Sequence, residues 1–247
     1  MKSLLIPTLV LALSGVASAE TLRLRGPNYY PYTGAADSSH PGFMVEVARD
    51  IFALHGIDIQ YGVLPWNRLL EGTDKGRYDC LLGIHPSEEP RLDYTQEPWA
   101  VMAPHIYVRK DDPLEYEDLT SFKRRRVAVI KDSRMAEALK PFKKMAPERL
   151  LEFDEWDGVA EMVRKLRLGE VDVVALPKVQ MEAYLNATGF HELVRDAGLL
   201  TKPVPLYVAC TTAKPDAEQW LKWLSEDVLT LKREGRWQEL ETKYGLR

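Results

Sequence analysis

Hydrophobic positions along this chain recur at two different spacings. Residues 22–26 alternate apolar and polar side chains with the two-residue period of a β-strand, and residues 57–64 and 80–84 are further predicted strands. Between them, apolar side chains recur at three- and four-residue spacing, which predicts helices over about 42–54 and 66–75. The order strand, helix, strand, helix, strand predicts a parallel sheet flanked by helices.

The same order returns after residue 125. Residues 126–130, 151–153 and 171–176 are predicted strands, and helices are predicted between them. Gly76-Arg77-Tyr78-Asp79 closes a helix before one buried strand, and Gly169-Glu170-Val171-Asp172 does the same before another. Two such matches in similar units predict two lobes of like architecture.

The last part of the chain indicates how the lobes are joined. An amphipathic stripe over about 217–231 predicts a long helix, which Gly235 breaks before a second, short one. Two extended segments, 105–110 and 206–211, run between the two units. Such a pair is what two crossings of the chain between lobes require.

The first nineteen residues are expected to be a separate segment. Lys2 gives a positive start, residues 4–16 form an apolar run, and Ala17-Ser18-Ala19 is a small-residue cleavage site. This order is typical of a secretory signal peptide, although a buried first helix is the alternative. No Cys lies near the cleavage point, and no later apolar run reaches the roughly 18 residues that span a membrane. We therefore expect an exported, soluble protein without a lipid anchor.

Composition narrows the class further. With 45% hydrophobic and 28% charged residues the chain is an ordinary globular protein, which excludes collagen-like, coiled-coil and disordered classes. A formal net charge of -4 without a dominant basic stretch argues against a nucleic-acid partner. The two cysteines, Cys80 and Cys210, either pair in an oxidising compartment or remain buried thiols. The histidines are scattered singly, so neither a metal nor a cofactor is expected.

Several short motifs follow one another in an informative order. They are the loop Tyr29-Tyr30-Pro31-Tyr32, Gly42-Phe43 at a helix start, Gly76-x-x-Asp79, Ser87-Glu88-Glu89-Pro90-Arg91, Tyr94-Thr95-x-x-Pro98-Trp99, Asp118-Leu119, Gly169-x-x-Asp172, and Gly235 with Lys243-Tyr244-Gly245. This order resembles bacterial extracellular solute-binding protein family 3, the amino-acid-type substrate-binding proteins of ABC importers. The resemblance covers essentially the whole mature chain.

The resemblance implies an α/β, two-lobed fold of the type II periplasmic-binding-protein kind. Each lobe would be a mainly parallel sheet flanked by helices, and two hinge strands would join the lobes around a ligand in the cleft. The expected limits are 1–19 for the signal peptide, 20–109 plus 208–247 for lobe 1, and 110–207 for lobe 2. The implied partners are a small-molecule ligand and an inner-membrane ABC permease, and a monomer is expected.

The resemblance also implies how a ligand carboxylate is held. An Arg in the loop that contains Arg91 grips the carboxylate, because a guanidinium fork matches its two oxygens, and Ser87 would add a hydroxyl. The alternative is a solvated surface arginine. The turn at Ser133 and Arg134 would complete the clamp with backbone N–H groups at a helix start.

Aromatic walls are implied on the opposite side of the ligand. Tyr30 and Tyr32 are at the positions of the family's aromatic wall, although either could simply pack on the first helix. Trp66 and Arg68 open the second predicted helix. Arg68 either faces the cleft or pairs with Glu71 along the helix surface.

One position departs from the family pattern. The Asp that usually pairs with the α-ammonium group of an amino acid is replaced by Pro177. An unpaired ammonium in a closed cleft would cost several kcal/mol, so Asp154, Glu155 or Asp157 would have to substitute. Otherwise the ligand lacks the ammonium and is more acidic, or it is not an α-amino acid.

The function expected from this sequence is capture of a small polar, carboxylate-bearing solute and its delivery to an ABC importer. One alternative is an accessory or sensor-partner protein whose cleft has lost its ligand. Another is a lyase similar to cyclohexadienyl dehydratases, with His85, Glu88 and Glu89 as candidate acid or base groups. No Walker, Gly-x-Ser-x-Gly or His-Glu-x-x-His motif is present, so we expect a protein that is not an enzyme.

Overall fold

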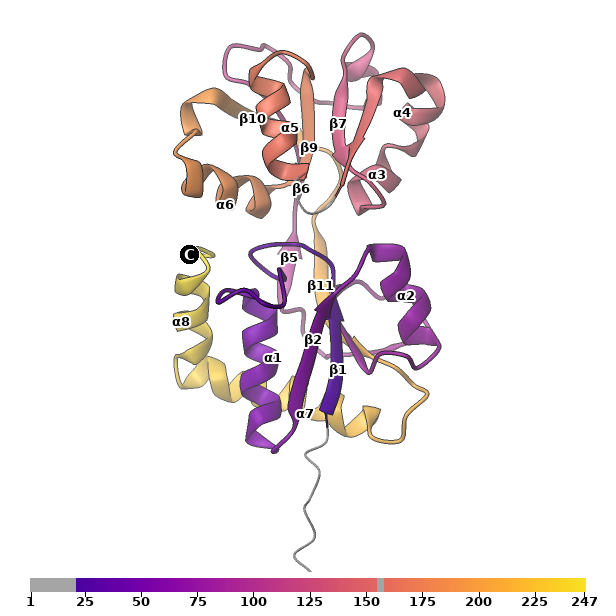
Figure 1. The fold of residues 1–247 in the computed structure, drawn as a ribbon, viewed down its shortest axis with the longest axis vertical. Coiled ribbons are helices and arrows are strands. Elements are labelled where there is room, and N and C mark those ends of the chain that lie inside the picture. Colours follow the sequence, from indigo (N-terminus) through magenta and orange to yellow (C-terminus); the bar gives the residue numbers. More distant parts are fainter. Residues whose placement is uncertain (1–20, 155–157) are drawn as a thin grey trace, which may run out of the picture.

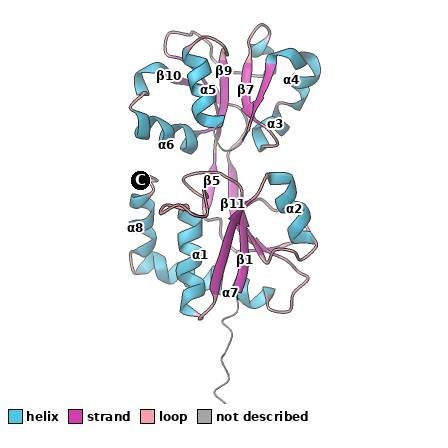
Figure 2. Ribbon diagram, in the orientation of Figure 1, coloured by secondary structure: helices cyan, strands magenta, loops and turns pink. Residues whose placement is uncertain are grey.

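The computed structural model describes residues 21–154 and 158–247 (Figure 1). Two sheets lie one beyond the other along the longest axis, and each is flanked by helices (Figure 2). The predicted two-lobed α/β fold is confirmed. The predicted signal peptide, 1–19, and the candidate residues Glu155 and Asp157 lie outside the described residues. Within the described ranges, no helix is both long and apolar enough to cross a membrane.

The first lobe contains six strands in the order β2-β1-β3-β11-β4, with β5 also paired to β11. Its strands are β1 (Thr21–Gly26), β2 (Asp58–Val63), β3 (Cys80–Ile84), β4 (Asp93–Tyr94), β5 (Ala100–Met102) and β11 (Val204–Cys210). Its helices are α1 (Phe43–Leu54), α2 (Trp66–Asp74), α7 (Ala217–Arg233) and α8 (Arg236–Lys243). The first three strands are parallel, as the sequence pattern predicts.

The strand period explains how this sheet is covered. Leu24 and Leu82 point to one face and pack in a cluster with residues of α1, α7 and α8. Leu81 and Ala209 point to the other face, where they meet Leu69 of α2. Successive residues of a strand face opposite sides, so strands that are apolar throughout become buried on both.

The second lobe contains five strands in the order β10-β6-β9-β7-β8. They are β6 (Pro104–Arg109), β7 (Val127–Ile130), β8 (Leu150–Phe153), β9 (Val173–Pro177) and β10 (Val194–Leu199). The helices are α3 (Arg134–Ala138), α4 (Lys140–Met145), α5 (Gly158–Arg167) and α6 (Lys178–Thr188), with 3₁₀ turns at Leu119–Phe122, Pro147–Arg149 and His191–Leu193. The helical segment that follows β7 is divided at Leu139 into α3 and α4, because Pro141 lacks an N–H and fits only the first turn of a new helix.

The chain passes between the sheets at Ala103 and again within 200–203. The segments expected to cross, 105–110 and 206–211, correspond mainly to β6 and β11, which are hydrogen-bonded on both sides within the sheets they enter. The pairing therefore places β6 in the second sheet and residues 204–207 in the first, unlike the expected lobe limits at 109 and 208. A sequence pattern identifies an extended segment but does not show which strands pair with it.

A disulfide joins Cys80 of β3 to Cys210 of β11. Both side chains are completely buried, and the two residues are direct partners in the antiparallel pairing of these strands. This resolves the choice between a disulfide and two free thiols that the sequence left open.

The first Gly-x-x-Asp motif ties the turn after α2 to β1. Asp79 accepts hydrogen bonds from the backbone N–H of Arg23 at 2.6 Å and from its Nη2 at 2.9 Å, and Nη2 also donates to the Gly76 carbonyl at 3.1 Å. Lys214 forms a second ion pair with the same carboxylate. Burial alone would raise the pKa of Asp79, but the hydrogen bonds from Arg23 and Lys214 outweigh it and lower that pKa.

The second motif makes the same contacts in the other lobe. Asp172 accepts hydrogen bonds from the backbone N–H of Arg126 at 2.9 Å and from its Nη2 at 3.1 Å. The same Nη2 donates to the Gly169 carbonyl at 2.5 Å. Burial opposes ionisation here too, yet the hydrogen bonds from Arg126 lower the pKa of Asp172. The repeated motif is therefore a repeated structure.

Candidate functional site

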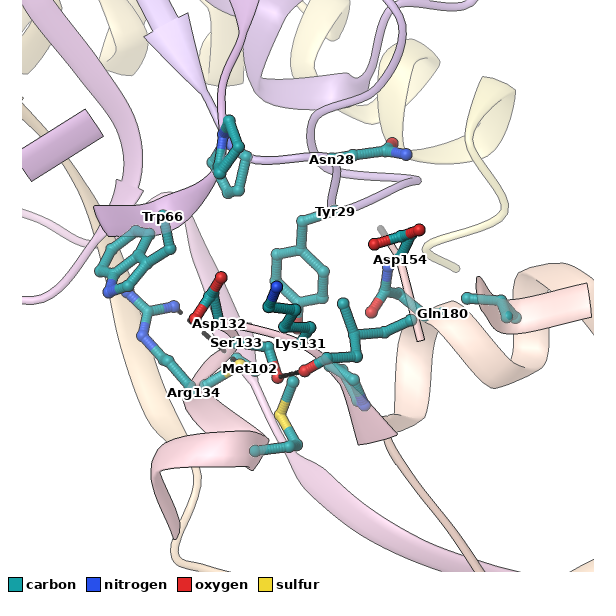
Figure 3. Close-up of a pocket in the computed structure, with 16 residues that line it drawn as sticks. Asn28, Tyr29, Trp66, Met102, Lys131, Asp132, Ser133, Arg134, Asp154 and Gln180 are labelled. Atoms are coloured by element: carbon teal, nitrogen blue, oxygen red, sulfur yellow. Dashed lines mark hydrogen bonds between the residues drawn. The ribbon is translucent and has the colours of Figure 1, made fainter. Parts of the chain in front are cut away.

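A pocket of about 270 Å³ lies between the two lobes (Figure 3). Apart from Met102 of β5, its lining comes from the ends of β7 and β9 and from the segments that follow β1, β2, β7, β8 and β9. These are the carboxyl ends of parallel strands, where open α/β sheets bind ligands. The lining residues are Pro27, Asn28, Tyr29, Pro65, Trp66, Met102, Ile130, Lys131, Asp132, Ser133, Arg134, Met135, Asp154, Val159, Pro177 and Gln180.

Tyr29 is the aromatic residue that the loop after β1 places in the pocket, and the sequence analysis did not select it. Its ring lies between Trp66 and Arg134 on one side and Asp154 and Gln180 on the other (Figure 3). The side chain is only 6% exposed, and its hydroxyl has no hydrogen-bond partner among the described residues. Burial raises the pKa of this hydroxyl well above its usual value, so it stays protonated and can donate.

The other two tyrosines of this loop lie elsewhere. Tyr30 is exposed and meets the ring of Tyr244 edge-on. The hydroxyl of Tyr32 donates to the Val101 carbonyl at 3.2 Å, and its ring lines a separate groove beside β5. In a loop without a regular period, only the fold determines which of three tyrosines faces the cleft.

Arg134 reaches from α3 across to the first lobe. Its Nε and Nη2 donate to the two carboxylate oxygens of Glu88, and Nη2 also donates to the Gly83 carbonyl at 3.0 Å. The guanidinium carbon lies 4.3 Å from the centroid of the Trp66 ring, which is a cation–π contact. The side chains of Arg134 and Glu88 are 15% and 19% exposed, so little water reaches the pair.

Arg91 and Ser87 do not line this pocket. Arg91 is bound at 2.7 Å to Glu89 and at 2.8 Å to Asp74, and 64% of its side chain is exposed. The hydroxyl of Ser87 lies 2.8 Å from Nδ1 of His85. From the same loop after β3, Glu88 instead contacts a lining residue of the pocket, Arg134.

Arg68 also lies away from the lining. Trp66 at the start of α2 lines the pocket, whereas Arg68, two residues later, is exposed. Two residues of a helix are about 200° apart around its axis, so both cannot face the same cleft.

The turn after β7 contributes four consecutive polar residues to the pocket, Lys131 to Arg134. Asp132 has φ 54°, a left-handed conformation that Asp tolerates better than most residues. Ser133 caps α3: its hydroxyl accepts from the Ala136 N–H at 3.2 Å and donates to the Ile130 carbonyl at 2.6 Å. The hydroxyl of Ser133 is therefore already hydrogen-bonded to backbone groups of the same turn and helix.

Pro177 lines the pocket at the position where the resemblance would place an ammonium-pairing Asp. Asp154, one of the substitutes considered from the sequence, lines it as well, next to Gln180. In the parts of the chain that the structure describes, no group of three or more His, Cys, Asp or Glu could hold a metal ion. The pocket combines apolar walls with a few charged groups, which suits a small organic molecule.

The family model for bacterial extracellular solute-binding proteins, family 3, matches residues 25–247. A search of curated proteins found no significant match.

Several solved structures share the fold. An ancestral arginine-binding protein bound to arginine is 19% identical with a TM-score of 0.72, over 91% of this chain and 97% of that one. A histidine-bound ABC uptake transporter substrate-binding protein from Streptococcus pneumoniae is 14% identical with a TM-score of 0.73, over 91% and 92%. A histidine kinase sensor domain with similarity to periplasmic binding proteins is 22% identical with a TM-score of 0.72, over 92% and 96%.

Proposed function

The chain belongs to the bacterial extracellular solute-binding proteins of family 3, and from that premise we propose that it captures a small polar solute and delivers it to an ABC importer. The pocket between the lobes is the observation that supports this most directly. Tyr29 and Trp66 of the first lobe and Asp132 and Asp154 of the second line the same space. A ligand that contacts both walls stabilises the closed form, so capture and hinge closure are coupled.

The proposal extends to location and assembly. The N-terminal pattern supports export and cleavage after Ala19, which would release a soluble monomer into the periplasm. The partner would be an inner-membrane permease that recognises the closed form.

We propose binding rather than catalysis because Glu88 and Glu89, two of the acid or base candidates from the sequence, are already engaged in ion pairs. Glu88 is held by Arg134, and Glu89 is held by Arg91. The side-chain hydrogen bond from Arg91 lowers the pKa of Glu89, so this carboxyl is ionised and a poor general acid. Neither of these two carboxylates lines the pocket.

A sensor-partner role is the second candidate. It is favoured by the ion pair of Arg134, because a guanidinium bound to a protein carboxylate is one fewer anchor for a solute. A histidine kinase sensor domain is also among the structures with this fold.

The test is a thermal-shift screen of residues 20–247, unfolded and refolded to remove bound compounds. The panel contains arginine, histidine, glutamine, dicarboxylates, aromatic acids and polyamines. A ligand at a hundredfold excess over its Kd stabilises the protein by about 2.7 kcal/mol. We expect at least one compound to raise the Tm, and the shift to be lost in Asp154→Ala but kept in Arg91→Ala, whose side chain lies outside the pocket. If no compound stabilises a protein that circular dichroism shows to be folded, the sensor-partner role is favoured.

A further inference from the structure

The ion pair between Arg134 and Glu88 decides which chemical groups of the pocket remain for a ligand. Glu88 belongs to the turn after β3 in the first lobe, and Arg134 opens α3 in the second. One oxygen of Glu88 also accepts the backbone N–H of His85 at 2.8 Å. The carboxylate is therefore fixed from its own lobe while it binds the guanidinium of the other lobe.

The guanidinium has little capacity left for a second carboxylate. The Nε and Nη2 edge that forms paired hydrogen bonds is taken by Glu88, with the Gly83 carbonyl on Nη2 as well. One face of the group lies on Trp66, and Nη1 lies 4.0 Å from the sulfur of Met102. A ligand carboxylate would have to displace Glu88, which would leave that mostly buried carboxylate without its counter-ion.

The charges that remain on the pocket wall favour a cation. Because Arg134 and Glu88 neutralise one another, the lining is left with one ammonium, on Lys131, and two carboxylates, on Asp132 and Asp154. Among the described residues, no ion pair joins any of these three to another side chain. The ring of Tyr29 adds an aromatic surface, which attracts organic cations further.

We propose that Glu88 and Arg134 form a clasp between the lobes and that the ligand is a small organic cation, an amine or guanidine without a carboxylate. The inference rests on the proposed function as a solute receptor and names the ligand class. The clasp supplies, from within the protein, the carboxylate–guanidinium contact that an amino acid would otherwise make. Asp132 and Asp154 then balance the charge of the ligand.

Matched ligand pairs test the ligand class directly. Arginine and agmatine, lysine and cadaverine, and histidine and histamine differ in each case by the carboxylate alone. Isothermal titration calorimetry on the refolded protein should show at least one decarboxylated member binding about tenfold or more tightly than its amino acid, which is about 1.4 kcal/mol. Tighter binding of the amino acid in every pair that binds would overturn the proposal.

A variant with a matched control tests whether the clasp causes the preference for ligands without a carboxylate. Glu88→Gln removes the carboxylate that occupies Arg134, so the preference for the decarboxylated member should shrink by about tenfold or reverse. Glu89→Gln is the control, because this neighbouring carboxylate binds the exposed Arg91 outside the pocket, and the preference should stay unchanged. If Glu88→Gln leaves the preference unchanged, or if both variants change it equally, the clasp does not exclude carboxylates.

A ligand-free measurement separates the clasp from the receptor function. Denaturant unfolding of Glu88→Gln, Arg134→Gln and the double variant forms a double-mutant cycle. We expect the free energy of unfolding of the double variant to be no lower than that of the less stable single variant. Each single change leaves one charge without its partner, whereas the double change removes both charges. If the two losses simply add, there is no clasp. If no compound in the pairs binds, the proposed ligand class fails, whereas the receptor function is decided by the wider thermal-shift panel. The cycle still decides whether the clasp exists.

Discussion

The two Gly-x-x-Asp motifs make the same hydrogen bonds in surroundings that differ. The Asp79 side chain is 1% exposed and has two cationic partners, Arg23 and Lys214. Asp172 is 20% exposed and is paired with Arg126 alone among the described side chains. A repeated motif thus fixes a repeated geometry, whereas its contribution to stability depends on what the rest of each lobe places around it.

The largest expected difference between the lobes comes from the disulfide beside the first motif. Cys80 follows Asp79 directly and pairs with Cys210 across a separation of 130 residues. Replacing both cysteines by Ala should lower the free energy of unfolding by about 4 kcal/mol, because the unfolded chain loses a long closed loop. Urea unfolding of the double variant against the unmodified protein measures this. A loss below about 1 kcal/mol would mean that strand pairing alone holds β11 in place.

Removing each carboxylate tests the comparison itself. Asp79→Ala should cost about 3 kcal/mol, because it leaves two cations facing a buried site. Asp172→Ala should cost about 1 kcal/mol, since water can partly replace a less buried partner. Equal losses in the two variants, measured by the same urea unfolding, would show that burial does not set the contribution.

The glycines of the motifs allow a finer comparison. Gly76 has φ 67° and Gly169 has φ 69°, so Ala at either position should cost about 1 kcal/mol of backbone strain. A Cβ at Gly76 would also lie 3.3 Å from the Cβ of Ala213, whereas nothing lies within 4 Å of one at Gly169. The Tm should therefore fall further in Gly76→Ala than in Gly169→Ala. The reverse order would contradict the packing around the first turn.

The smallest effect is a change in acid sensitivity. The folded-state pKa values of Asp79 and Asp172 lie below their usual range, so their contributions are complete above the unfolded pKa of about 3.9. Those contributions disappear as the pH falls from there through the lower folded values. Each Asp→Ala variant should therefore lose less stability than the unmodified protein between pH 7 and pH 3. Urea midpoints at the two pH values measure this, and parallel losses would argue against the lowered pKa values.

The fold was largely predictable because most of its elements have a strong apolar period. The exceptions are α6, β10 and the short strands β4 and β5, none of which the spacing of apolar residues predicts. The buried residues of α6 are Met181 and Leu185, so its apolar stripe is too narrow to recognise from spacing.

The site was only partly predictable. Trp66, Ser133 and Arg134 line the pocket, but Arg91 and Ser87 do not. The loop after β3 has no period, and which of its charged residues faces inward depends on a contact with Arg134 in the other lobe. The residues next to Glu88 in the sequence do not indicate that contact.

The placement of β11 in the first sheet has a consequence for the order in which the lobes are completed during synthesis. All strands of the second sheet, β6 to β10, lie within residues 104–199, so they are available before β11 has been made. The first sheet, although its strands emerge first, stays open between β3 and β4 until that strand arrives. The lobe that begins first is therefore finished last. Until β11 is made, Cys80 remains a free thiol, because its disulfide partner Cys210 lies 130 residues further along the chain.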